Sequence, residues 1–300
     1  MQLLRDRIAA LKKERNAVIL AHNYCLPEVQ DIADHVGDSL GLSVIASGSD
    51  ADVIVFCGVT FMAESAKILA PEKKVLMPEP AATCPMASMC SAEQMIDARN
   101  CHKDACVIGY VNTTASAKAE MDICCTSSNA VSIVSSVKGD DVIFVPDANL
   151  GAYVSSMAPE KRVTLWNGYC PVHQAITARN ITELKERYPN AKVLAHPECR
   201  KEVLDISDVI GSTEKMAEHV RTSDRGEFIM ATEIGMRYRL EKECPGKKIH
   251  FVPHALCSVM KMTSLPSVLN ALETMSAEVI IDEYTLKRAR GPLMKMIGKG

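Results

Sequence analysis

Short runs of apolar and β-branched residues recur along the chain in the same order three times. The first run of each set covers residues 17–22, 106–110 and 192–196, and the third covers 53–58, 142–146 and 228–231. A fourth run, opened each time by two basic residues, covers 73–76, 161–164 and 247–250. Runs of this length and composition predict buried strands.

The second run of each set ends in small hydroxyl residues. These clusters lie at 47–49, 126–128 and 211–213. Because the four runs keep the same order in each third of the chain, we expect the clusters to occupy equivalent places in three structural repeats.

The segments between the runs have apolar residues at helical spacing. Behind Pro27, for example, such residues recur from Val29 to Leu40 and predict a helix over 27–40. Short buried strands that alternate with helices imply parallel sheets covered by helices on both faces. The predicted fold class is therefore α/β, with three pseudo-threefold-related αβα repeats whose parallel sheets surround a central active site.

The same pattern predicts three domains. The first is residues 1–88, with 258–300 packing back on it, the second is 89–174, and the third is 175–257.

Composition excludes several classes of partner. The chain of 300 residues is 47% hydrophobic and 24% charged, with a net charge of −3, so it offers no basic field for nucleic acid or anionic lipid. No apolar run reaches the roughly 18 residues of a membrane helix, and residues 1–15 form an amphipathic pattern rather than a signal peptide. We expect a cytoplasmic protein with small-molecule partners, no nucleic acid and no membrane.

Three of the twelve cysteines follow the fourth run of each unit at nearly equal spacing. They are Cys84, Cys170 and Cys257. In a reducing compartment cysteines favour metal binding or catalysis over disulfides, and three converging thiolates suit a soft metal. Three interpretations stay open on spacing alone: a [4Fe-4S] cluster, a zinc site completed by His173 or His254, and loop cysteines that bind no metal.

Polar side chains also lie at the end of the first run of each unit. They are His22 and Tyr24, then Tyr110 and Asn112, then His196 and Glu198. Ligands bind beyond the carboxyl ends of parallel strands, and imidazole, phenol and carboxylate groups there suit proton transfer and carboxylate recognition. A lone histidine is often structural, but titratable groups in all three units favour a functional role.

The hydroxyl clusters, above all Ser127, Ser212 and Thr213, resemble strand-to-helix turns. Their hydroxyls and free backbone N–H groups favour a phosphate or carboxylate at a helix N-terminus. The competing interpretation is simple N-capping, and the two roles are compatible.

An ordered set of motifs resembles the quinolinate synthase family almost end to end. The motifs are Leu-Ala-His-Asn-Tyr at 20–24, Gly-Asp-Ser-Leu at 37–40, Gly-Tyr-Val-Asn at 109–112, Cys-Thr-Ser-Ser-Asn at 125–129, Pro-Asp-Ala-Asn-Leu-Gly at 146–151, Trp-Asn-Gly-Tyr-Cys at 166–170 and His-Pro-Glu-Cys at 196–199. Phosphate-loop, dinucleotide and nucleophile-elbow motifs are missing from the sequence.

The resemblance implies an enzyme of NAD biosynthesis that condenses iminoaspartate with dihydroxyacetone phosphate to quinolinate, with release of phosphate and water. It implies a [4Fe-4S] cluster on Cys84, Cys170 and Cys257, with one open iron as Lewis acid. The implied catalytic residues are His22, Tyr24, Tyr110, His196 and Glu198. The implied substrate-binding residues are His22, Ser39, Tyr110, Asn112, Ser127, His173, His196, Glu198, Ser212 and Thr213.

The implied partners are the iron-sulfur assembly machinery and, functionally, an aspartate oxidase or dehydrogenase that supplies the short-lived imine. Two alternatives remain: a three-cysteine iron-sulfur reductase of a diphosphate substrate, and a non-enzymatic iron-sulfur carrier or sensor. The reductase would need an electron donor, and a carrier would not need histidine, tyrosine and glutamate around an open iron.

Overall fold

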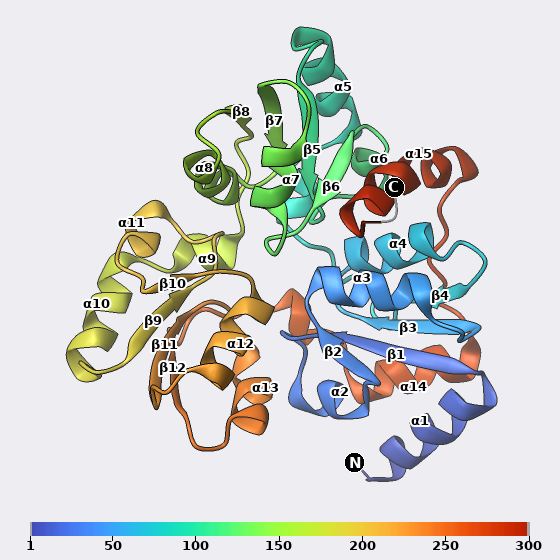
Figure 1. Ribbon diagram of the computed structural model, residues 1–300. Coiled ribbons are helices and arrows are strands. Elements are labelled where there is room, and N and C mark those ends of the chain that lie inside the picture. The colour runs from blue at the N-terminus through green and yellow to red at the C-terminus, as the bar shows by residue number, and fades with distance from the viewer. Residues whose placement is uncertain (1, 299–300) are drawn as a thin grey trace.

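The computed structural model describes residues 2–298 and has three lobes around a common centre (Figure 1). The first lobe contains α1 (Gln2–Glu14), β1 (Ala17–His22), α2 (Pro27–Ile32), β2 (His35–Gly37), α3 (Ser39–Gly48), β3 (Val53–Cys57), α4 (Thr60–Leu69), β4 (Lys74–Leu76) and the 3-10 helix η1 (Met86–Met89). The second contains α5 (Ala92–Cys101), β5 (Cys106–Tyr110), α6 (Ala115–Lys118), β6 (Ile123–Cys125), α7 (Ala130–Ser136), β7 (Asp141–Val145), α8 (Ala148–Met157) and β8 (Arg162–Leu165).

The third lobe begins with the short helix that follows β8. It contains α9 (Pro171–Ala175), α10 (Ala178–Arg187), β9 (Lys192–Ala195), α11 (Lys201–Leu204), β10 (Val209–Ile210), α12 (Thr213–Thr222), β11 (Glu227–Ala231), α13 (Met236–Glu243) and β12 (Lys248–Phe251). The chain then continues through the 3-10 helix η2 (Val259–Lys261), α14 (Leu265–Thr274) and α15 (Glu283–Met296).

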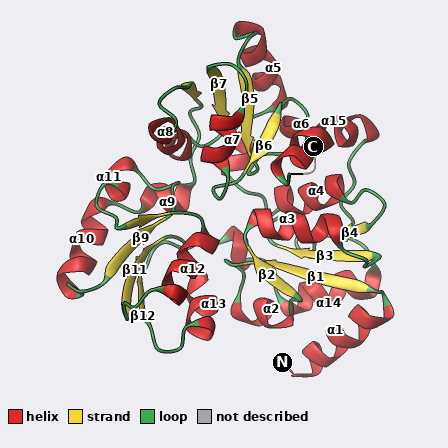
Figure 2. Cartoon of the chain, viewed as in Figure 1, coloured by secondary structure: helices red, strands yellow, loops and turns green. Residues whose placement is uncertain are grey.

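Each lobe holds one four-stranded parallel sheet, and the strand order is the same in all three. The orders are β2-β1-β3-β4, β6-β5-β7-β8 and β10-β9-β11-β12. Figure 2 shows these sheets between helices. The predicted fold class, an α/β protein with three repeated αβα units, is confirmed.

Two side-chain devices recur at equivalent positions and explain why the repeat is visible in the sequence. Asp34, Asp122 and Asp208 precede the second strand of their units, and each carboxylate accepts a hydrogen bond of 2.7–2.8 Å from a backbone N–H of the first strand. The lysine that opens each fourth run, Lys73, Lys161 or Lys247, donates to backbone carbonyls just before the third strand. The aspartates connect the start of the second strand to the first strand, and the lysines connect the start of the fourth strand to the segment before the third.

The helix predicted over 27–40 is wrong, because a short strand interrupts it. Residues His35–Gly37 pair with the end of β1, and the helical pattern continues only after Asp38, whose carboxylate caps α3 by accepting from Gly41 N–H. The hydroxyl cluster at 47–49 lies at the end of α3 and not after β2. Counted from the recurring aspartates, the true equivalent of Ser127 and Thr213 in the first unit is Ser39.

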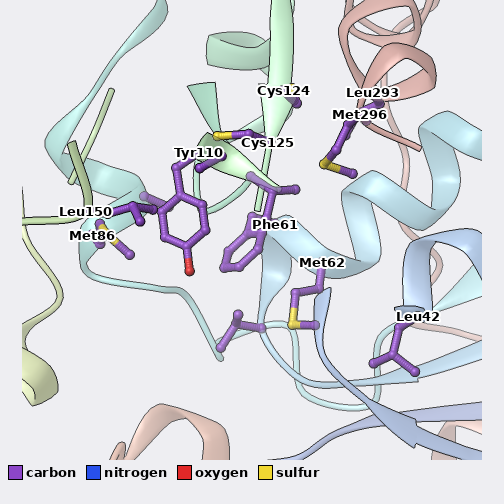
Figure 3. Packing of buried hydrophobic residues seen from close by; sticks show 14 of the residues in the cluster. Leu42, Phe61, Met62, Met86, Tyr110, Cys124, Cys125, Leu150, Leu293 and Met296 are labelled. Atoms are coloured by element: carbon purple, nitrogen blue, oxygen red, sulfur yellow. The ribbon is translucent and has the colours of Figure 1, made fainter. Parts of the chain in front are cut away.

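Alternation along the strands divides the core of the first unit into two layers. Ile54 and Phe56 of β3 belong to the large central cluster on the side of α3 and α4, whereas Val53 and Val55 pack with residues of α1 and α14. Buried residues of all three units join the central cluster, and part of it is drawn in Figure 3. The three lobes therefore share this central cluster, while a separate buried cluster packs within the third lobe.

The C-terminal helices pack against two units. Helix α14 lies on α1 and β3, whereas α15 lies against α4 of the first unit and against α6 and β6 of the second. Leu293 and Met296 of α15 are buried in the central cluster, beside α4 in Figure 3. Residues 299 and 300, the end of the segment expected to pack on the first domain, lie outside the described residues. Within the described chain, none of the helices combines the length and the hydropathy that crossing a membrane requires.

We expect Leu293→Ala to lower the free energy of unfolding by about 2–5 kcal/mol, because it removes a fully buried side chain at the seam between two units. Urea denaturation measures the change. The matched control is Leu3→Ala on α1, where the side chain is exposed and the expected change is within about 0.5 kcal/mol. Equal effects of the two substitutions would contradict the packing described for α15.

Candidate active site

The ends of the first strands of all three units meet at one cavity. All but one of the residues that the family resemblance implies for the site line it: His22, Tyr24, Ser39, Cys84, Tyr110, Asn112, Ser127, Cys170, His173, His196, Glu198, Thr213 and Cys257. The fold thus gathers side chains that are far apart in the sequence.

Ser212 is the exception. Its hydroxyl accepts a hydrogen bond from Lys215 N–H and caps α12, the position that Asp38 occupies at the start of α3. The side chain is buried but does not line the cavity. At this turn Ser212 caps the helix, and the next residue, Thr213, lines the cavity.

Each of the three cysteines that line the cavity precedes a short helical turn. Backbone N–H groups two or three residues further on donate to the sulfur: those of Met86 and Ala87 to Cys84, that of His173 to Cys170, and those of Val259 and Met260 to Cys257. N–H groups aimed at sulfur favour the thiolate form. The same local geometry in all three units fits thiolates that hold a metal.

Burial works against ionisation of these thiols. It raises the pKa of Cys84 to about 12, and it also raises the pKa values of Cys170 and Cys257. A bound cation would reverse this shift, because a coordinating thiol loses its proton to the metal. The donor set therefore fits a soft metal centre better than three free thiols.

Two buried carboxylates accept hydrogen bonds from backbone N–H groups of the cysteine loops. Asp147 accepts a hydrogen bond of 3.1 Å from Cys170 N–H, and Glu233 accepts one of 3.0 Å from Cys257 N–H. Both carboxylates are completely buried and follow the third strand of their units at the same place. The first unit has Val59 there, so its cysteine loop lacks this support.

A chain of polar contacts crosses the cavity wall and has Glu198 at its centre. Tyr24 Oη lies 2.8 Å from Thr232 Oγ1, which lies 3.0 Å from His173 Nε2. His173 Nδ1 lies 2.7 Å from Glu198 Oε2.

The chain continues beyond Glu198 into the second unit. His196 Nδ1 lies 3.3 Å from the same oxygen of Glu198, and His196 Nε2 lies 3.1 Å from Ser127 Oγ. With a proton on His173 Nδ1, the hydroxyls of Tyr24 and Thr232 can both donate toward Glu198. Groups from all three units thus form one path along which protons can move.

Burial and pairing set the protonation states along this path. Burial alone would raise the pKa of the Glu198 carboxyl, but attraction and hydrogen bonds from His173 and His196 lower that pKa well below its usual range. Burial, with the nearby Glu198, raises the pKa of Tyr110, and burial raises that of Tyr24. At neutral pH the cavity presents a carboxylate next to protonated phenols.

The two histidines that follow first strands are neutral at neutral pH. Burial, followed by the charge of Lys261, lowers the pKa of His22 to about 3, and burial lowers the pKa of His196 despite the opposing Glu198. Neutral imidazoles can accept a proton from a substrate or pass one on.

Two buried oxygen atoms of the cavity lack hydrogen-bond partners among the described residues. They are Asn112 Oδ1 and Glu198 Oε1, and both residues line the cavity. An unsatisfied buried acceptor costs about 1–3 kcal/mol, so such atoms are commonly completed by a ligand, an ion or water. The geometry also gathers one sulfur, one imidazole nitrogen and one carboxylate oxygen, from Cys170, His173 and Glu198, within 4.8 Å of one another.

Sequence reasoning did not find Thr232, Asp147 and Glu233. Thr232 bridges Tyr24 and His173, and the two carboxylates support cysteine loops. A signal was available, since Asp147 and Thr232 directly follow the third run of their units and Glu233 comes next after Thr232. The unpredicted Phe61 and Asp38 also line the cavity.

Together these features define a class: an α/β enzyme with three parallel sheets around one buried site that combines cysteines with a carboxylate–histidine–tyrosine network. The family model described as quinolinate synthetase A protein matches residues 6–298. Proteins named quinolinate synthase are similar over nearly the whole chain. One from Dehalococcoides mccartyi is 51% identical over 99% of this chain and 98% of its own, and one from Methanoregula boonei is 49% identical over 98% of both chains.

A third relative with this name, from Aquifex aeolicus, is 46% identical over 98% of this chain and 93% of its own. The chain belongs to the quinolinate synthase family, and the resemblance seen in its motifs is confirmed.

We expect acid to destabilise the metal-free protein through His22. In the unfolded chain His22 has its ordinary pKa of about 6.5, whereas in the folded protein its pKa is about 3. Between these two pH values the unfolded state binds one more proton than the folded state. The free energy of unfolding should therefore fall by up to about 1.4 kcal/mol per pH unit in this window on account of this one group. Urea denaturation between pH 7.5 and 5.5 measures the slope.

The variant His22→Gln should flatten that slope, whereas His35→Gln, at an exposed position on β2, should leave it unchanged. A His22→Gln protein with the full wild-type slope would show that His22 is not buried in its neutral form.

Proposed function

We propose that this chain is a quinolinate synthase that condenses iminoaspartate with dihydroxyacetone phosphate and releases phosphate and water as the pyridine ring closes. The observation that carries the proposal is the continuous path from Tyr24 through Glu198 to Ser127 inside a cavity that also contains three cysteines. Its relatives carry the name of this enzyme. The product is a precursor of NAD.

We propose further that Cys84, Cys170 and Cys257 hold a [4Fe-4S] cluster. Support comes from the chemistry of the donors: three sulfurs on equivalent turns, each receiving backbone N–H groups, and an unpartnered Glu198 oxygen in the same cavity. When bound through three cysteines, such a cluster supplies one Lewis-acidic iron that no protein thiolate occupies. A structural zinc site would have no use for an open position.

The proposed roles of the chain's own residues follow from their protonation states. Glu198, ionised and adjacent to two imidazoles, accepts a proton from a substrate carbon or nitrogen. His22, neutral and buried, takes or returns a second proton, and the Tyr110 phenol donates one to a leaving oxygen. Burial of these groups keeps water away from an imine that hydrolyses readily.

The hydroxyls at equivalent turns are proposed to bind the anionic groups of the substrates. Ser39 and Thr213 are the first residues of α3 and α12, and Ser127 stands just before α7. Hydroxyls and free N–H groups at such positions suit phosphate and carboxylate oxygens. Asn112, with its unpartnered amide oxygen, accepts from a substrate N–H or O–H.

The family match favours this function over a diphosphate reductase or an iron-sulfur carrier. Because the imine is short-lived, the proposal includes a functional link to an aspartate oxidase or dehydrogenase, and cluster assembly requires the cell's iron-sulfur machinery. The direct test is an anaerobic assay in which aspartate oxidase generates the imine in the presence of dihydroxyacetone phosphate and quinolinate is measured by chromatography. Absence of quinolinate with a fully loaded cluster would reject the proposal.

We expect Cys170→Ala to lose the cluster and the activity together, because the two remaining thiolates are too few ligands to hold the cluster. Iron and sulfide analysis of anaerobically purified protein, with an absorption spectrum near 400 nm, measures the loss. The control is Cys101→Ala, at an exposed thiol that does not line the cavity, which should keep both. A brown, active Cys170→Ala protein would contradict the ligand assignment.

We expect Thr232→Val to lower kcat by about 100-fold, the lower end of what a positioned proton-transfer group contributes. Valine keeps the shape of threonine but breaks the link between Tyr24 and His173. Iron content and KM should stay near the wild-type values. Thr182→Val, at an exposed position on α10, is the matched control, and equal rates for the two variants would rule out a proton path through Thr232.

A further inference from the structure

The cavity wall contains no lysine or arginine among the described residues, although the proposed substrates are a dicarboxylate and a phosphate ester. Two cations that lie outside the lining act on His22 through their charge. Arg239 is paired with Glu214 and Glu243, and Lys261 is paired with Glu233. Their charge is largely compensated by these partners, so the source of attraction for anions must be sought elsewhere.

Lys118 is the buried cation that differs from the others. It ends α6, its side chain is completely buried, and it forms no ion pair with a carboxylate in residues 2–298. Its Nζ donates a hydrogen bond to the carbonyl oxygen of Thr113 and lies 5.3 Å from the centre of the Phe61 ring. Burying a lysine without a paired carboxylate is energetically unfavourable, so a completely buried lysine at this position indicates a function for its charge.

Both contacts of Lys118 lead to the cavity. Phe61 lines the wall, and in Figure 3 its ring is drawn next to that of Tyr110. Thr113 directly follows Asn112, whose unpartnered Oδ1 also lies in the lining residues. Lys118 therefore supports the loop that presents Asn112 and places its ammonium group behind an aromatic side chain of the wall.

The surroundings of Lys118 leave its charge available to a ligand. Burial lowers the pKa of Lys118, whereas Cys124, Glu64 and Cys84 oppose that shift. Glu64 uses its carboxylate to accept from Ala115 N–H, the first residue of α6, at 2.9 Å. A carbonyl oxygen and a ring face stabilise an ammonium group without neutralising its charge. The attraction between this charge and an anion is stronger across a low-dielectric wall than across the same distance in water.

We propose that Lys118 is a positioning residue that fixes the Asn112 loop and supplies, from behind Phe61, the positive charge that selects dianionic ligands. This inference rests on the proposed function, because that function makes the ligands anionic. Lys118 does not touch the substrate in this assignment. Its charge acts through the wall, and its hydrogen bond acts through Thr113.

The test uses three substitutions that separate charge from hydrogen bonding. Lys118→Arg keeps the charge, Lys118→Gln keeps a donor for Thr113 without the charge, and Lys118→Met keeps neither. Each anaerobically purified holoprotein is checked for iron content and thermal midpoint. Calorimetry then measures the dissociation constants for pyridine-2,3-dicarboxylate and for its monoamide, which carries one charge fewer.

A charge acting across the wall should weaken binding of the dicarboxylate about tenfold in both the Gln and Met variants, and binding of the monoamide only about threefold. The Arg variant should stay within about threefold of wild type for both ligands. Lys103→Met, at an exposed position in the second unit, is the control and should change neither constant.

Equal losses for both ligands, or a Gln variant that binds the dicarboxylate like wild type, would overturn the electrostatic role. If Lys118→Met does not fold, the Arg and Gln pair still decides the question. A wild-type protein that loads its cluster but binds neither ligand would reject the proposed function itself. Wild-type binding with unchanged variants would reject only the role of Lys118.

Discussion

The pairing of one buried carboxylate, Glu198, with two imidazoles is the interaction on which the site depends. Burial alone would raise the pKa of a carboxylate in this place, and direct contacts of 2.7 and 3.3 Å with His173 and His196 lower the pKa of Glu198 instead. Removing one partner of such a buried group costs several kcal/mol. Because Thr232 and Ser127 hold the outer sides of the imidazoles, the charge also fixes how the second and third units face each other.

The three units share one backbone arrangement, and the different side chains at equivalent positions determine the chemistry of the cavity. The aspartate and lysine devices around the strands are the same in every unit, so the strand ends arrive at the cavity in the same way. Counted from those aspartates, Tyr24, Asn112 and Glu198 occupy one equivalent position. A phenol, an amide and a carboxylate at a single place of the repeat give the cavity three different functions from one backbone plan.

Much of this could be predicted from the sequence, for reasons that particular residues make clear. Cys84, Cys170 and Cys257 were identifiable because the repeat places them after equivalent strands, and the strands themselves were identifiable by their apolar runs. The strand at 35–37 was missed because three residues between two helical segments carry too little pattern to interrupt a helical period. Ser212 was expected in the cavity because a capping serine and a ligand-binding serine look the same in sequence.

Thr232 and Lys118 illustrate a different limit of sequence reasoning. A threonine after a strand and a lysine at the end of a short helix are common, and only the fold shows that one bridges Tyr24 and His173 and that the other is completely buried. Their roles come from contacts between segments that are far apart in the chain. Periodicity and spacing contain no information about such contacts.

The central proposal is that three cysteines, one from each unit, would hold a [4Fe-4S] cluster with one iron left open to a ligand. Mössbauer spectroscopy of the protein loaded anaerobically with ⁵⁷Fe, with and without pyridine-2,3-dicarboxylate, tests it most directly. The account predicts a [4Fe-4S] spectrum in which one iron of the four changes its isomer shift and quadrupole splitting when the ligand is added. Mössbauer parameters of all four irons that stay unchanged when the ligand is added would contradict it, as would a protein that contains zinc and no cluster.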